Sequence, residues 1–69
     1  MNEIIERWKK DLHNYEIGLV MLQEWQKEYS KDSFRFAVIQ EQIDFHDFNI
    51  KGLTQLIDET TKELEDNQQ

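Results

Sequence analysis

The chain has 69 residues, no cysteine, no proline and a net charge of −7. Below about 70–80 residues a single hydrophobic core rarely contributes more than about 3–5 kcal/mol, so such chains usually rely on disulfides, a metal or a second subunit. The lack of cysteine excludes disulfides, thiolate metal sites and thiol chemistry, and it fits a reducing compartment. The composition therefore predicts one small domain, 1–69, that gains stability by association.

The first residues contain early acids, Glu3 and Glu6, and no long apolar run, so they do not resemble a signal peptide. The longest strongly apolar stretch covers residues 17–22. A bilayer-spanning helix needs about 20 such residues. We expect a soluble cytoplasmic protein.

The first predicted helix covers residues 2–29, with Asn2 as its cap. Apolar side chains recur along it every three or four residues, which forms one stripe on a helix and requires a partner helix. This first seam consists of Ile5, Trp8, Leu12, Tyr15, Leu19, Leu22, Gln26 and Tyr29.

A polar turn is predicted at residues 30–33, Ser-Lys-Asp-Ser, followed by a second helix over residues 34–66 that Asp32 or Ser33 can cap. The second helix repeats the alternation of three and four. Its seam consists of Phe36, Ile39, Ile43, His46, Ile50, Leu53, Ile57, Thr60 and Leu64. If the chain reverses near residue 31, residues that face each other have numbers that sum to about 62. Tyr15 then lies level with His46, and Gln26 with Phe36.

The predicted fold is therefore all-α, an antiparallel two-helix hairpin that resembles a coiled coil. Gly52 leaves an alternative open, because a left-handed glycine there could end a helix and Thr54 could cap a third one. The seam crosses Gly52 without a shift, from Ile50 to Leu53 to Ile57, which favours a continuous helix.

Further apolar residues lie outside both seams, mainly in the half of the hairpin near the turn. They are Ile17, Val20, Met21, Trp25, Phe34, Val38, Phe45 and Phe48. Left in water, they would form a larger apolar patch than monomeric soluble proteins normally expose. We expect these eight residues to form a dimer or partner interface, with a homodimeric four-helix bundle as the main interpretation and a groove on another protein as the alternative.

No catalytic, cofactor or metal site is expected. His46 lies on the second seam, where a buried imidazole bonded to Tyr15 or a carboxylate is a more common role than proton transfer. The Glu-x-x-His pairs of di-metal bundles are absent, since residues 43 and 10, three before His46 and His13, are isoleucine and lysine. Phosphate-binding loops and nucleophile motifs are also absent, so we do not expect an enzyme.

The negative charge is concentrated in residues 41–69, which hold eight acids and two bases. Phosphate neutralisation by basic residues drives most non-specific nucleic-acid binding, so direct binding to nucleic acid or to an anionic membrane is not expected. A candidate acidic surface for a basic protein partner comprises Glu41, Asp44, Asp47, Asp58, Glu59 and Glu63.

These patterns predict a small acidic, non-catalytic protein–protein interaction module, such as an adaptor or a regulator that inhibits a larger protein. Two alternatives remain open: a structural element that assembles with itself, and an acidic mimic of nucleic acid that occupies a DNA-binding protein.

Overall fold

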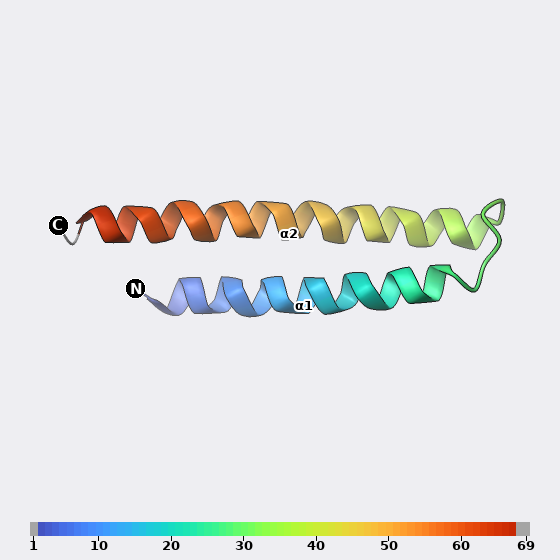
Figure 1. Ribbon diagram of the computed structural model, residues 1–69, viewed down its shortest axis with the longest axis horizontal. Coiled ribbons are helices and arrows are strands. Elements are labelled where there is room, and N and C mark those ends of the chain that lie inside the picture. Colours follow the sequence, from blue (N-terminus) through green and yellow to red (C-terminus); the bar gives the residue numbers. More distant parts are fainter. Residues whose placement is uncertain (1, 68–69) are drawn as a thin grey trace.

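The structure is a computed structural model that describes residues 2–67, excluding the side chain of Asn2, so the cap predicted there lies outside the described part. It contains two helices, α1 (Asn2–Gln26) and α2 (Phe34–Asn67). The helices lie side by side and antiparallel, and the longer α2 continues beyond the start of α1 (Figure 1). The hairpin measures 55 × 14 × 12 Å. The predicted all-α hairpin is confirmed.

The two predicted seams form the contact between α1 and α2. Ile5, Ile39 and Ile43 are buried, and Ile39 is the most enclosed, with 3% of its surface exposed. Every other seam residue is half-buried, and none is exposed. With three buried side chains in the described part of the chain, the core of one hairpin is as thin as the chain length predicts.

The predicted register is also confirmed, at two separate levels of the hairpin. The rings of Tyr15 and His46 meet edge to face with their centroids 5.5 Å apart. Nearer the turn, Gln26 Nε2 donates hydrogen bonds to the backbone oxygen of Phe36 at 3.3 Å and to Gln40 Oε1 at 2.9 Å. These bonds satisfy the one amide in the first seam, so its polar group does not weaken the contact.

Helix α1 ends at Gln26, three residues earlier than predicted. The N–H groups of Glu28 and Tyr29 bond to the carbonyls three residues before them, Trp25 and Gln26, at 3.1 Å each. Such bonds tighten and terminate a helix. Tyr29 nevertheless packs against Trp25, with ring centroids 6.2 Å apart. The apolar spacing therefore continues into the connecting segment, residues 27–33, after the helix has ended.

Ser33 caps α2, which confirms one of the two predicted caps. Its Oγ accepts a hydrogen bond from the N–H of Phe36 at 3.2 Å and donates one to the carbonyl of Ser30 at 2.7 Å. The first bond satisfies a backbone donor that the helix itself cannot pair. The hydroxyl thereby links the turn to the first turn of α2.

Gly52 lies inside α2, which continues past it to Asn67. No glycine among residues 2–67 adopts a positive φ, so the left-handed stop that a third helix would need is not present there. The three-helix alternative is wrong, and the uninterrupted second seam was the correct indication.

Candidate functional site

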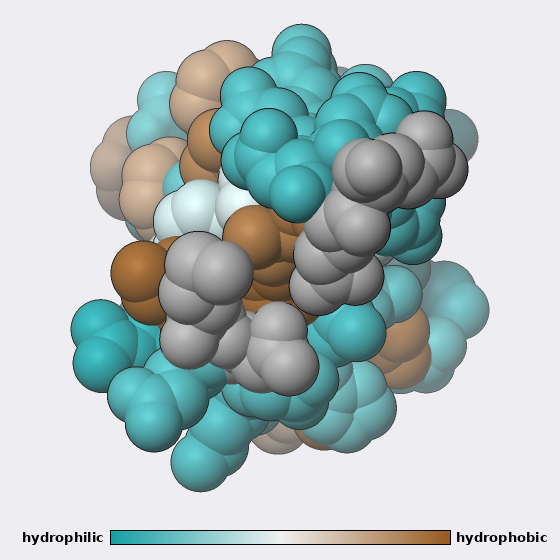
Figure 2. Space-filling view, turned by 90° about the vertical axis from the view of Figure 1, so that its left-hand side faces the viewer, coloured by the Kyte–Doolittle hydropathy of each residue, from teal (hydrophilic) through white to brown (hydrophobic). Residues whose placement is uncertain are grey.

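Large apolar side chains outside the two seams remain open to solvent in the half of the hairpin near the turn. They are Ile17, Met21, Trp25, Phe34, Val38, Phe45 and Phe48, and we call them the apolar face; four of them, Met21, Trp25, Phe34 and Val38, line hollows between the helices. Figure 2, which looks along the hairpin from the end near both termini, shows hydrophobic residues at the upper left and between the helices, a smaller hydrophobic area at the lower right, and hydrophilic residues over most of the rest. Seven of the eight predicted interface residues belong to this face.

Val20, the eighth predicted residue, lies on the other side of α1. Gly18 and Val20 flank the seam residue Leu19, and at about 100° per residue they point some 200° apart. Gly18 lines a hollow of the apolar face, so the exposed Val20 projects away from it. Val20 therefore does not line this hollow, and its place in an interface stays a prediction.

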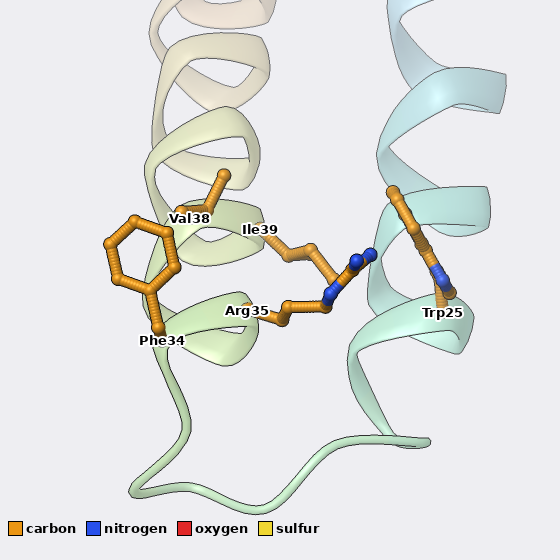
Figure 3. Close-up of a pocket in the computed structure, with 5 residues that line it drawn as sticks. All are labelled: Trp25, Phe34, Arg35, Val38 and Ile39. Carbon is orange, nitrogen blue, oxygen red and sulfur yellow. The ribbon is translucent and has the colours of Figure 1, made fainter.

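The end of the apolar face nearest the turn is a shallow hollow between the helices, lined by Trp25 from α1 and by Phe34, Arg35, Val38 and Ile39 from α2 (Figure 3). The side chain of Arg35 reaches across toward Trp25, while the ring of Phe34 stands on the outer side of α2. The guanidinium carbon of Arg35 also lies 6.0 Å from the centroid of the Tyr29 ring, at the limit for a cation–π contact. Phe34 remains 82% exposed.

A second hollow adjoins the first and is lined by Gly18, Met21, Leu22, Trp25, Gln42 and His46. Trp25 belongs to both hollows, so they form one continuous surface along the groove between α1 and α2. Gly18 forms the floor beside His46, because a Cβ atom there would lie 3.0 Å from Nε2 of the imidazole. The absence of a side chain at residue 18 lets the histidine ring lie over α1.

His46 does not form the hydrogen bond predicted for it. Its Nδ1 lies 2.8 Å from the backbone oxygen of Gln42, and because a carbonyl only accepts, this nitrogen carries the proton. The half-buried ring meets Tyr15 and Phe45 edge to face instead. The histidine is therefore a packing residue at the edge of the apolar face, bonded within its own helix.

Two exposed apolar residues that the sequence pattern did not single out, Ile4 and Leu56, lie on the same side in the far half of the hairpin. Each directly precedes a seam residue, Ile5 and Ile57, just as Trp25 directly precedes Gln26. That shared position was the signal that could have identified them.

The opposite side of the hairpin is polar. On α2, Asp47 pairs with Lys51 at 3.0 Å, and Asp44 accepts a hydrogen bond from Gln40 at 3.0 Å. Near the end of α1, Lys27 pairs with Glu24 at 3.0 Å. These pairs are solvent-exposed and contribute little to stability individually.

The six acids of the candidate acidic surface do not form a single patch. At about 100° per residue, they are spread over roughly half of the circumference of α2. Glu41, Asp44 and Asp47 follow one another around the helix, while Glu59 and Glu63 lie toward the apolar side. On α2, the four residues of the apolar face span a narrower arc, about 80°.

Within residues 2–67, no group of three histidine, aspartate or glutamate side chains is placed to hold a metal ion. Neither helix in the described part has a stretch long and apolar enough to span a lipid bilayer. Comparisons with protein-family models, curated protein sequences and solved structures found no match for this chain. The apolar face is the surface with the clearest capacity for binding.

Proposed function

We propose that this protein is a small non-catalytic interaction module, an adaptor or a regulator, that works through its apolar face. We further propose that a second copy covers this face, so that two hairpins form a four-helix bundle. The observation that carries the proposal is the presence of seven large exposed apolar side chains on a hairpin whose own seams are already filled.

The exposed area supports association. Trp25, Phe34, Phe45 and Phe48 are 46–82% exposed. Because a buried aromatic side chain hides about 150–250 Å², these four alone offer about 500 Å² per copy. Together with Ile17, Met21 and Val38, they approach the roughly 600–1,000 Å² per partner of stable protein interfaces.

Stability supports the same conclusion. A core of this size contributes about 3–5 kcal/mol at most. Each large apolar side chain that moves from water into an interface adds up to about 1.5–3 kcal/mol, in proportion to the area it loses. Covering the apolar face would therefore raise the stability of the hairpin by an amount comparable with its own core.

A pair of matched variants tests the proposal. Phe48 is 75% exposed, so Phe48→Asp removes little packing within one hairpin. Thr54→Asp introduces the same charge at an exposed position on the polar side of α2. Sedimentation velocity of both variants should show a monomer for Phe48→Asp and a dimer for Thr54→Asp. A dimer of unchanged affinity in both variants would place the contact elsewhere and refute the proposal.

A further inference from the structure

Helix α2 carries a second regular stripe on the side away from α1. Phe34, Val38, Glu41, Phe45 and Phe48 follow one another at alternating intervals of four and three residues. All five are exposed, although the same spacing in the two seams produces buried or half-buried residues. An apolar stripe with a period of 3.5 residues is the pattern by which one helix packs along another. This outer stripe therefore fits a helix rather than a loop or a flat surface.

The outer stripe is also symmetric along α2. Glu41 stands midway between Phe34 and Phe48, and Val38 and Phe45 lie three residues before it and four residues after it. The stripe therefore presents a similar apolar pattern in either direction from Glu41.

We infer that α2 packs antiparallel on α2 of a second copy, around a two-fold axis that passes beside Glu41. A two-fold axis requires a surface that matches itself when it is reversed, and the outer stripe meets this requirement. Phe34 then lies against Phe48 of the partner subunit, and Val38 against Phe45 of the partner subunit. This arrangement rests on the dimer proposed above and places its contact on the α2 part of the apolar face.

The charge distribution favours this arrangement over the main alternative. The axis lies in the half of the hairpin near the turn, so residues beyond about 52 extend past the partner. The acids of this part, among them Asp58, Glu59 and Glu63, project at opposite ends of the dimer. If instead α1 packed on α2 of the partner subunit around an axis parallel to the helices, both acidic ends would lie side by side. Like charges repel most strongly within a Debye length of about 10 Å, which the antiparallel arrangement avoids.

Ile4 and Leu56 lie outside the region of overlap and stay exposed in this dimer. Isolated exposed apolar residues are common and need no partner. The two side chains are thus compatible with an interface confined to residues 34–48 of α2.

Spin labels measure the arrangement directly. The chain has no cysteine, so Asp58→Cys provides a single attachment site beyond the overlap. Asp58 lies 17 residues from Glu41, so at a rise of 1.5 Å per residue two labels should be separated by about 50 Å. In the parallel alternative the two labels share one level of a bundle whose neighbouring helices lie roughly 8–10 Å apart, so their separation falls below about 30 Å.

A labelled protein that is a dimer by mass but gives the short distance overturns this inference alone. A labelled protein that is monomeric at every concentration overturns the proposed dimer as well.

Glu41 provides a second, independent readout. At the axis it lies close to Glu41 of the partner subunit, so Glu41→Gln removes a repulsion and should lower the dissociation constant of the dimer about two- to five-fold. Asp44→Asn, which removes the same charge from the polar side of α2, should change it much less. Equal effects of both substitutions would contradict an axis at Glu41.

Discussion

Gly18 of α1 lies directly against the imidazole of His46 on α2: a Cβ atom built on Gly18 would be 3.0 Å from Nε2 and 3.1 Å from Cδ2. The ring is held on its other sides by Tyr15 and Phe45. The two helices can therefore approach closely at this level because residue 18 has no side chain. The contact joins the seam between the helices to the apolar face.

The two glycines of the chain should respond differently to alanine. Gly52 is in the interior of α2, and a Cβ atom added there would have open space for 4 Å around it, so Gly52→Ala should raise the free energy of unfolding by about 0.5–1 kcal/mol through helix propensity. Gly18→Ala has the same propensity gain but must displace the His46 ring. We expect it to be less stabilising than Gly52→Ala, measured by urea unfolding followed by circular dichroism.

His46 is the reason for this difference, which a double variant can check. Replacing His46 with alanine removes the obstructing ring, so Gly18→Ala should become more favourable in the His46→Ala background than in the original chain. If Gly18→Ala were equally stabilising in both backgrounds, the close contact between residue 18 and the His46 ring would not affect the free energy of unfolding.

Ile39 should be the most sensitive position of the seam. It is 3% exposed, and truncation of a buried isoleucine to alanine costs about 2–5 kcal/mol. That cost equals or exceeds the stability expected for a core of this size, so Ile39→Ala should lose most of its helical circular dichroism at 25 °C. Leu56→Ala, on the exposed side of the same helix, is the matched control and should keep its helicity. Retention of the full signal by both variants would show that Ile39 is not central to the core.

The cap at Ser33 should be measurable in the same way. Ser33→Ala removes the acceptor of the Phe36 N–H and should lower the free energy of unfolding by about 1 kcal/mol. Ser30→Ala removes a longer bond from the N–H of Asp32, 3.3 Å in the exposed turn, and should cost less. The opposite order would mean that the turn, rather than the cap, fixes the start of α2.

Much of the fold follows from the sequence because a period of 3.5 residues specifies both the helices and the surface on which they meet. All seam residues from Ile5 to Leu64 are buried or half-buried as the spacing predicts. The end of α1 was missed because Tyr29 continues the apolar spacing from a segment that is no longer helical. Spacing records where side chains recur, whereas a helix end depends on backbone hydrogen bonds.

The candidate site was predictable in composition but only partly in arrangement. The exposed apolar residues could be found as the set outside both seams. Val20 and Met21 are adjacent in the sequence and project about 100° apart on α1. Only the structure shows that Met21, and not Val20, lines the hollow between the two helices. Ile4 and Leu56 were not predicted because few other apolar residues outside the seams lie near them, and only their position directly before a seam residue connects them to Trp25.

Sedimentation equilibrium of the unmodified protein over a wide concentration range tests the central claim most directly. If a second copy covers the apolar face, the mass at high concentration should be twice the 8.5 kDa of one chain, and helicity should fall as dilution separates the copies. A single 8.5 kDa species that keeps its helicity at every concentration would contradict the account.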